Sequence, residues 1–301
     1  MKRQWINYLC DPFDKSKIKI INGKLISETG NEYKIREGVP ILLSSNSQSQ
    51  ESVQSFAYEW EQFGFLFAKK GWVKYLINPL VGGLDFFKNK IVIDAGSGSG
   101  AQSRWIAEAG AKLVISLELS DSIFTVHPKS VGKFRKKVFA IQCDIAQPPL
   151  NIKPDIVYCM NVIQHTKDPE HAFLALSRLV QGKTLFLFNI YDKSKHSDKK
   201  LFLIKSIRVI TRILPFVLWK WLSFLCITVL FLLLKVPKLG AGICRFYPVA
   251  YSFKETWLNL YDLGGKHFYQ EFFSKSSQEA MIKKAGLKIK NRTKFGYVLT
   301  R

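Results

Sequence analysis

The stretch IVIDAGSGSG, residues 91–100, decides the fold of this chain. A run of β-branched residues ends in Asp94, three glycines follow at alternate positions, and a helical pattern begins at Ala101. This order is typical of a buried strand, a tight loop and a helix start, where a loop without Cβ atoms brings backbone N–H groups against a ligand. The Gly-x-Gly-x-Gly spacing differs from the Gly-x-Gly-x-x-Gly of dinucleotide sites. Together with Asp94, it points away from NAD and towards a ligand with a charged amino-acid end.

Strand and helix patterns alternate through the middle of the chain. The expected strands cover residues 91–95, 113–118, 138–142, 155–160 and 184–190, and the expected helices cover 101–109 and 169–180. Such alternation indicates βαβ units, and therefore an α/β fold whose parallel sheet is covered by helices on both faces. A helix at 277–285 and strands at 287–294 and 296–300 complete the sheet.

The rest of the chain divides around this core. Residues 1–45 predict a small β-rich module, because Asn22-Gly23 and Gly30-Asn31 are hairpin signals between alternating segments. Residues 46–55 are rich in Ser and Gln and predict a linker. The core then covers 56–192 and 251–301, and residues 193–250 form a basic and apolar insertion.

Net charge and cysteine usage limit the possible binding partners and the cellular compartment of the protein. The chain has 301 residues with 45 Lys and Arg against 23 Asp and Glu, a net charge of +22. This excess implies an anionic partner, either nucleic acid or an acidic lipid surface. The five cysteines are scattered without metal-ligand spacing, which favours reduced thiols in the cytoplasm. Residues 1–11 lack the apolar core of a secretory signal.

The insertion contains two apolar segments. In residues 201–212, Lys205, Arg208 and Arg212 share one helix face, so the segment predicts a basic amphipathic helix. Residues 216–234 are apolar except for Lys220. This second segment could span a membrane, lie in the interface or dip in as a hairpin, or form a buried helix pair under a lid. Because the sheet needs strands from beyond the insertion, we favour an element that lies in the cytoplasmic face of a membrane.

With this context, residues 56–191 and the last strands resemble the class I S-adenosylmethionine-dependent methyltransferases, in particular the Asp-x-Gly-x-Gly-x-Gly type. The resemblance implies a Rossmann-like, seven-stranded methyltransferase sheet and S-adenosylmethionine as the cofactor. It also implies roles for residues at the strand ends. The methionine part would contact Gly96, Ser97, Gly98 and Gly100, and Asp94 would bind its ammonium directly or through water. The ribose would contact Glu118, the adenine Asp144 and Ile145, and the sulfonium region Asn161, Val162 and His165.

Other residues have two possible roles. His165 is a candidate general base, although it could simply cap and pack the loop after its strand. Tyr58 and Trp60 lie in an aromatic segment that covers the cofactor in many small-molecule methyltransferases, or they only pack a helix. Asp262 and His267 flank a Gly-Gly pair and are candidates for the acceptor side, or for a polar turn.

The N-terminal module resembles the Trm112-like zinc ribbon in the stretches Leu9–Pro12 and 30–43. That family holds zinc with two Cys-x-x-Cys pairs. Here only Cys10 is present, and the other matching places hold Phe13 and approximately Ile26 and Thr29. Since one thiolate cannot complete a four-ligand site, we predict a module without metal.

These observations favour a methyltransferase that acts on a small-molecule, glycan or lipid-linked acceptor at an anionic membrane surface. One alternative is a soluble RNA methyltransferase. The residues after the fourth core strand are Asn161-Val-Ile-Gln, not the Asn/Asp-Pro-Pro-aromatic motif of exocyclic-amine enzymes, and no Pro-Cys nucleophile precedes them. The other alternative is a membrane-associated scaffold that keeps the fold without turnover.

Overall fold

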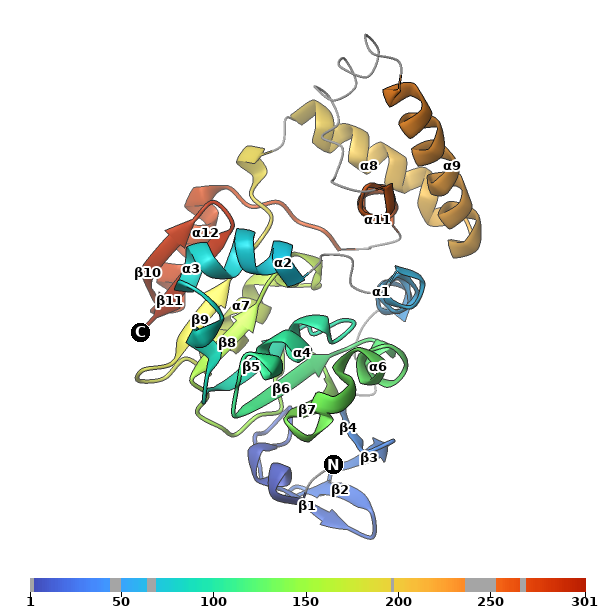
Figure 1. Cartoon of the computed structure of the whole chain (residues 1–301). Helices are drawn as coiled ribbons and strands as arrows, with labels where there is room; N and C mark the ends of the chain where they lie inside the picture. Colours follow the sequence, from blue (N-terminus) through green and yellow to red (C-terminus); the bar gives the residue numbers. More distant parts are fainter. Residues whose placement is uncertain (1–2, 44–49, 64–68, 196–197, 236–252, 266–268) are drawn as a thin grey trace.

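A computed structural model describes residues 3–43, 50–63, 69–195, 198–235, 253–265 and 269–301 (Figure 1). Its centre is one eleven-stranded sheet of order β1-β2-β3-β4-β7-β6-β5-β8-β9-β11-β10. The strands are β1 (Ile18–Ile21), β2 (Lys24–Ser27), β3 (Glu32–Arg36), β4 (Val39–Leu42), β5 (Ile91–Ala95), β6 (Leu113–Glu118), β7 (Val138–Cys143), β8 (Ile156–Cys159), β9 (Leu185–Phe188), β10 (Lys288–Thr293) and β11 (Gly296–Thr300).

Seven strands form the core that the sequence predicts. Strands β7, β6, β5, β8 and β9 are parallel, while β11 inserts antiparallel between β9 and β10. The chain order reverses between β5 and β8, and open α/β sheets bind ligands at the carboxyl ends of the strands beside such a switch point. The predicted α/β class is confirmed, and the expected strand bounds differ from the observed ones by two residues at most.

Helices cover both faces of the sheet, and others lie at one end of it. The α-helices of the described residues are α1 (Gln50–Phe63), α2 (Lys69–Trp72), α3 (Asn78–Val81), α4 (Ala101–Glu108), α5 (Ser122–Thr125), α6 (His127–Val131), α7 (Pro169–Ser177), α8 (Asp198–Ile213), α9 (Phe216–Leu234), α11 (Phe253–Leu263) and α12 (Lys275–Lys284). One apolar core joins α7 and α12 to the sheet through Phe173 and Met281, and a second joins α4 to the opposite face through Trp105 and Ile106. This burial of alternate side chains on both faces explains the continuous apolar runs of the central strands.

The N-terminal module extends the same sheet. Strands β1 to β4 form an antiparallel meander, and β4 then pairs in parallel with β7, with Ile41 opposite Gln142 and Leu42 opposite Cys143. Leu25 and Leu42 are fully buried in the core that the module shares with the sheet. The β-rich character of the module agrees with the prediction, although β4 was not expected as a separate strand.

The linker is shorter than predicted. Helix α1 begins at Gln50, so residues 50–55 are helical, and residues 44–49 lie outside the described residues. Ser55 is buried and Phe56 lines a cavity, so this Ser- and Gln-rich segment has an inward-facing side that composition alone does not show. Helix propensity is a weak guide where tertiary contacts decide.

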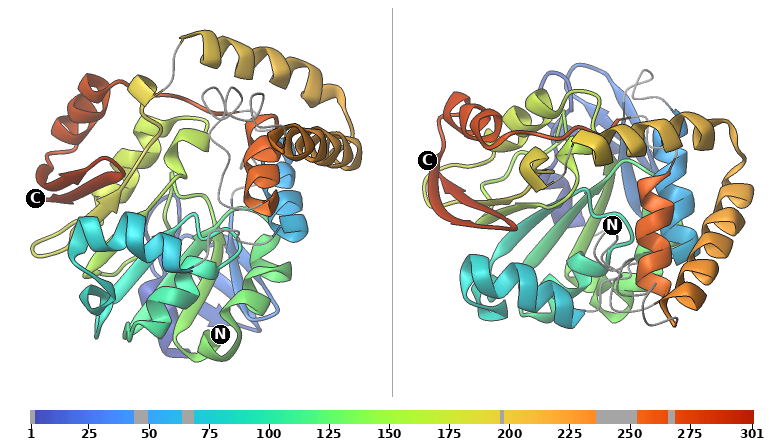
Figure 2. Two further views of the ribbon diagram at one scale, coloured as in Figure 1. Left: turned by 45° about the horizontal axis from the view of Figure 1, so that its top comes forward. Right: turned by 90° about the horizontal axis from the view of Figure 1, so that it is seen from above.

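Helices α8 and α9 of the insertion lie at one end of the molecule, beside α1 and opposite the N-terminal module (Figures 1 and 2). Helix α11 follows the predicted boundary at residue 250 but packs against α9, so the insertion as the structure shows it includes α11. These helices have their own small apolar core of Phe63, Trp219, Leu258 and Tyr261. In the part of the chain that the structure describes, α9 is the one helix long and apolar enough to span a membrane, and only 17% of its apolar window is buried.

The polarity of α8 differs from the prediction. Arg208 was expected on one basic helix face with Lys205 and Arg212, but only 5% of it is exposed, and Ile204 and Thr211 are buried beside it. Val209 and Ile213 are instead 68% and 81% exposed. The expectation of one shared basic face is therefore wrong for Arg208, because packing buries Arg208 together with Ile204, while Lys205 and Arg212 stay exposed beside Val209 and Ile213.

Candidate functional site

The loop between β5 and α4 has the backbone that the glycines require. Gly96, Gly98 and Gly100 have φ angles of 80°, 52° and 79°, a region that side chains disfavour. A Cβ atom at Gly96 would lie 2.4 Å from the Val162 side chain, and one at Gly98 would lie 2.9 Å from the ring of Trp60. The loop is therefore closely covered, and neither glycine can be replaced without displacing a neighbour.

Glu118 is held against this loop. Its Oε2 accepts a hydrogen bond from the Gly98 N–H at 2.7 Å, and its Oε1 accepts one from the Ser120 N–H at 2.9 Å. A carboxylate oxygen accepts more than one hydrogen bond, so both oxygens keep capacity for the hydroxyls of a ligand. Glu118 is only 8% exposed, and it lines a small cavity beside the loop.

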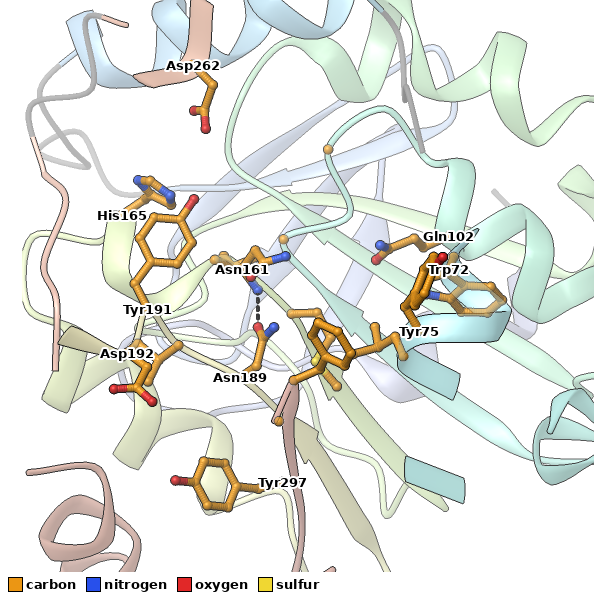
Figure 3. A pocket seen from close by; sticks show the side chains of 18 of the residues that line it. Trp72, Tyr75, Gln102, Asn161, His165, Asn189, Tyr191, Asp192, Asp262 and Tyr297 are labelled. Carbon is orange, nitrogen blue, oxygen red and sulfur yellow. Dashed lines mark hydrogen bonds between the residues drawn. The ribbon is translucent and has the colours of Figure 1, made fainter. Parts of the chain in front are cut away.

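This small cavity, of about 110 Å³, brings the strand-end residues together. Asp144 and Ile145 line it from the loop after β7, and Asn161 lines it from the loop after β8. Asn161 has a positive φ of 60°, and its N–H donates to the side-chain oxygen of Asn189 at 2.5 Å (Figure 3). A non-glycine residue in this conformation is strained, and such strain is concentrated at functional sites.

Asp94 lies behind the loop, away from the cavities. It is 1% exposed, accepts a hydrogen bond from the Ser103 hydroxyl, and does not line either cavity. Burial raises the pKa of Asp94 to about 7, and the neighbouring Glu118 carboxylate adds to the rise. Asp94 stabilises the start of α4 through Ser103, and its contact with the cofactor ammonium, directly or through water, stays a prediction.

A larger cavity of about 1080 Å³ adjoins the first (Figure 3). Both cavities share the lining residues Phe56, Trp60, Gly96, Gly98, Asn161, Val162 and His165. Among these shared residues, His165 is the one whose side chain, an imidazole, can accept a proton. His165 therefore lies at the junction of the two cavities, within reach of a ligand in either one.

The environment of His165 orients its ring. Its Nδ1 lies 3.2 Å from the backbone oxygen of Tyr269, and the ring makes edge contacts with Phe56 and Tyr191 at 5.2 and 5.4 Å. Because a carbonyl oxygen only accepts, the neutral ring carries its proton on Nδ1 and leaves Nε2 as an acceptor. This is the tautomer that a general base needs.

The other predicted residues are placed as follows. Ser97 lines the larger cavity, and its buried hydroxyl has no hydrogen-bond partner among the described residues. Gly100 is the N-cap residue of α4 and lies against His127, outside both cavities. Asp262 lines the larger cavity and points towards His165 and Tyr191 (Figure 3). His267 lies outside the described residues.

The two predicted aromatic residues, Tyr58 and Trp60, lie on helix α1 and face different parts of the molecule. Trp60 lies over Gly98 and lines both cavities. Tyr58 does not line either cavity; its ring stacks on Phe216 of the insertion, with centroids 5.2 Å apart. Side chains two positions apart on a helix point in different directions. Trp60 therefore contacts the glycine loop, whereas Tyr58 contacts the insertion.

Several lining residues were not predicted. Gln102, Asn189 and Tyr191 line the larger cavity, as does the buried Glu59. Asn189 and Tyr191 follow β9, and the rule that ligands bind at the carboxyl ends of parallel strands could have identified them. Glu59 could not be identified in this way, because it comes from a helix that precedes the sheet.

The site fits an adenosyl cofactor in its shape and its chemistry. The glycine loop offers a close backbone surface, and the fixed Glu118 carboxylate offers a hydrogen-bond acceptor for a diol. The Ser97 hydroxyl, which has no partner among the described residues, adds a polar group.

Comparison with known proteins agrees with this geometry. The model of the methyltransferase domain family matches residues 51–223. The chain belongs to this family. Its cofactor is S-adenosylmethionine, so the class I resemblance and the expected cofactor are both confirmed.

Two curated relatives are named ubiquinone biosynthesis O-methyltransferase. The one from Leptothrix cholodnii is 30% identical over 131 residues, which cover 40% of this chain and 54% of the relative. The one from Nitrosomonas europaea is 28% identical over 143 residues, which cover 46% of this chain and 57% of the relative. The chain thus spans about half the length of the curated relatives it matches.

Solved structures are similar at a more distant level. Magnesium protoporphyrin IX methyltransferase from Synechocystis, with bound SAH, is 16% identical, covers 85% of this chain and 87% of its own, and has a TM-score of 0.42. A complex that includes the Haloferax volcanii Trm112 methyltransferase activator is 12% identical, with coverages of 82% and 81% and a TM-score of 0.47. With scores this low, the fold assignment rests on the strand order.

Proposed function

We propose that this methyltransferase transfers a methyl group from S-adenosylmethionine to an oxygen of an amphipathic, lipid-linked small molecule at a membrane surface. The observation that carries the proposal is the position of His165, which lines both the small cavity at the glycine loop and the large cavity beneath the insertion. Cofactor and acceptor would meet beside its imidazole.

The residues of the chain have separate tasks in this reaction. When bound, the cofactor supplies a methyl group that its positive sulfur already activates, so the protein mainly orients the acceptor and excludes water. Glu118 holds the ribose, Asp144 and Ile145 bind the adenine, and Trp60 covers the glycine loop. His165 Nε2 accepts the proton of the acceptor hydroxyl while Tyr269 holds its Nδ1–H.

The insertion supports a membrane-bound acceptor. The apolar side chains on the outward faces of α8 and α9 include Phe202, Val209, Ile213, Trp221 and Leu225, each more than half exposed. Exposed cations on the same helices, among them Lys205 and Arg212, match an anionic lipid surface. Because β9 before the insertion and β11 after it pair with each other, both ends of the insertion return to one domain, which suits an element that lies in the interface.

The class of acceptor follows from the cavity and the relatives. A volume of about 1080 Å³ accommodates a ring with part of a long chain. The curated relatives are named for O-methylation in ubiquinone biosynthesis. An oxygen on the ring of a quinone-type precursor is therefore the acceptor atom that we propose for this chain.

We also propose that residues 1–45 are a Trm112-like module without zinc. Instead of a metal ion, the Asp11 side chain connects several residues of this module. Its carboxylate accepts hydrogen bonds from the Phe13 N–H, the Asn31 amide and the Tyr33 hydroxyl at 2.8 to 2.9 Å. No metal-ligand cluster occurs among the described residues, and Cys10 is buried with a raised pKa, mainly through desolvation.

One experiment tests the proposed function. The purified protein is incubated with methyl-labelled S-adenosylmethionine and, separately, with total lipid extract, a water-soluble metabolite fraction and total RNA from cells that lack the gene. We expect label in the lipid fraction alone, on a species that gains one methylene in mass. Label in RNA, or in none of the fractions while the cofactor binds, would contradict the proposal. A His165→Gln variant should bind the cofactor but transfer little label.

A further inference from the structure

Helix α1 contacts two different parts of the molecule. On one side, Phe56 and Trp60 line the cavities, and the Trp60 ring lies over Gly98. On the other side, Tyr58, Gln62 and Phe63 contact the insertion. Helix α1 thus lines the proposed cofactor site on one side and packs against the helices of the insertion on the other.

The contacts with the insertion are extensive. Tyr58 stacks on Phe216 at 5.2 Å with an interplanar angle of 19°, at the start of α9. Phe63 makes ring contacts with Trp257 and Tyr261 of α11 at 4.9 and 5.0 Å. These contacts place α1 in the small apolar core that belongs to the insertion.

The insertion is itself tied together around α11. The Trp219 indole N–H donates to the Tyr261 backbone oxygen at 3.0 Å, and the Trp257 indole N–H donates to the Ser223 hydroxyl at 2.9 Å. Figure 2 shows α11 alongside both α1 and α9. Since close-packed side chains transmit displacement, a shift of α9 on a membrane would carry α1 with it.

We propose that Tyr58 is a positioning residue that couples the insertion to Trp60 through Phe216, so that membrane docking and cofactor binding alter each other's affinity. The inference rests on the membrane docking proposed above. Coupling of this kind is reciprocal: the factor by which vesicles change cofactor affinity must equal the factor by which the cofactor changes vesicle affinity.

The test measures both effects on the full chain: the effect of vesicles on cofactor affinity and the effect of the cofactor on vesicle affinity. The affinity for S-adenosylhomocysteine is measured by calorimetry with and without vesicles that contain phosphatidylglycerol. The partition of the protein onto the same vesicles is measured by flotation with and without S-adenosylhomocysteine. We expect each affinity to change by about threefold to tenfold, and by the same factor in both arms, as suits the loss or gain of an aromatic contact.

Two variants assign the coupling to Tyr58. Tyr58→Phe keeps the stacked ring and should keep the coupling factor, whereas Tyr58→Ala should bring it close to one without abolishing either binding event. Thermal unfolding of each variant, read by circular dichroism, verifies that it is folded. If Tyr58→Ala does not fold, Phe216→Ala removes the same stack from the other side.

The outcomes separate the two proposals. Wild-type protein that binds both ligands with a coupling factor of one overturns this inference and leaves the proposed function standing. Coupling that survives in both Tyr58→Ala and Phe216→Ala also overturns it. Absence of vesicle binding overturns the inference together with the membrane part of the proposed function, and absence of S-adenosylhomocysteine binding overturns the cofactor site itself.

Discussion

The Glu118 carboxylate accepts the backbone N–H of Gly98 at 2.7 Å, so the end of β6 holds the glycine loop that follows β5. This contact joins the two most specific sequence signals of the chain at one point in space. It also means that Glu118 has a structural task even before a ligand binds, because it satisfies a buried backbone donor.

Replacing Glu118 should therefore weaken cofactor binding in two ways. Glu118→Gln removes the charged acceptor for the ribose and disturbs the support of the loop. We expect S-adenosylhomocysteine to bind tenfold to a hundredfold more weakly by calorimetry, equivalent to about 1–3 kcal/mol. Glu108→Gln, which changes a partly exposed carboxylate paired with Lys69, is the control and should bind normally. Equal affinities for both variants would remove Glu118 from the site.

His165 should affect methyl transfer without affecting cofactor affinity. A general base contributes about a hundredfold to ten-thousandfold, so His165→Gln should lower kcat by such a factor. A glutamine amide cannot take up the acceptor proton, so kcat should fall while the affinity for S-adenosylhomocysteine, measured by calorimetry, stays at the wild-type value. An unchanged kcat in the variant would show that another group accepts the proton.

The exposed apolar face of α8 should control membrane binding. Val209→Asp combined with Ile213→Asp places charges at two of its most exposed positions. We expect partition onto phosphatidylglycerol vesicles to fall at least tenfold, because each side chain loses roughly 1.5–3 kcal/mol of burial in lipid. Ile20→Asp combined with Ile21→Asp, at exposed positions in the N-terminal module, is the matched control. If the control loses binding equally, the docking surface is not on α8.

His127 should make the protein sensitive to acid. It lies 3% exposed behind the glycine loop, and burial first, with a contribution from Arg135, lowers its pKa from 6.5 to about 4. A base with a depressed pKa stabilises the fold above pH 6.5 and loses that contribution as pH falls from 6.5 to about 4. At pH 5 the loss is about 2 kcal/mol in the free energy of unfolding.

The neutral variant His127→Gln isolates this contribution. Between pH 7 and pH 5, urea unfolding should show a smaller loss of stability for the variant than for the wild type. The comparison between the two proteins cancels the opposite effect of Asp94, whose raised pKa favours the folded state as pH falls. Parallel stability curves would mean that His127 is protonated without cost.

Asp11 should hold the N-terminal module in place of a metal. Burial alone would raise its pKa, but hydrogen bonds from Asn31, Phe13 and Tyr33 outweigh this effect and lower it. Asp11→Ala leaves those donors without their acceptor, so we expect a loss of about 1–3 kcal/mol in the free energy of unfolding. A zinc chelator should leave the Tm of the wild type unchanged. A fall in Tm on chelation would contradict the metal-free module.

Much of the core fold could be predicted from the sequence because its determinants are local. The run Ile91–Ala95 followed by alternate glycines specifies a strand and a turn through β-branching and the absence of Cβ atoms, and these properties do not depend on distant residues. The same holds for the apolar length of α9, whose observed bounds equal the predicted ones.

What required the tertiary structure is the direction in which each side chain points. The sequence placed Arg208 with Lys205 and Arg212, and Tyr58 with Trp60, yet packing buries Arg208 and turns Tyr58 towards Phe216. It assigned Asp94 to the cofactor ammonium, and the fold adds that this carboxylate accepts a hydrogen bond from Ser103. Glu59 joined the cavity only because α1 packs against the glycine loop. Composition and spacing thus determined which elements form, whereas contacts between residues far apart in the chain decided which faces meet, since burial of an amphipathic face depends on the partner it finds.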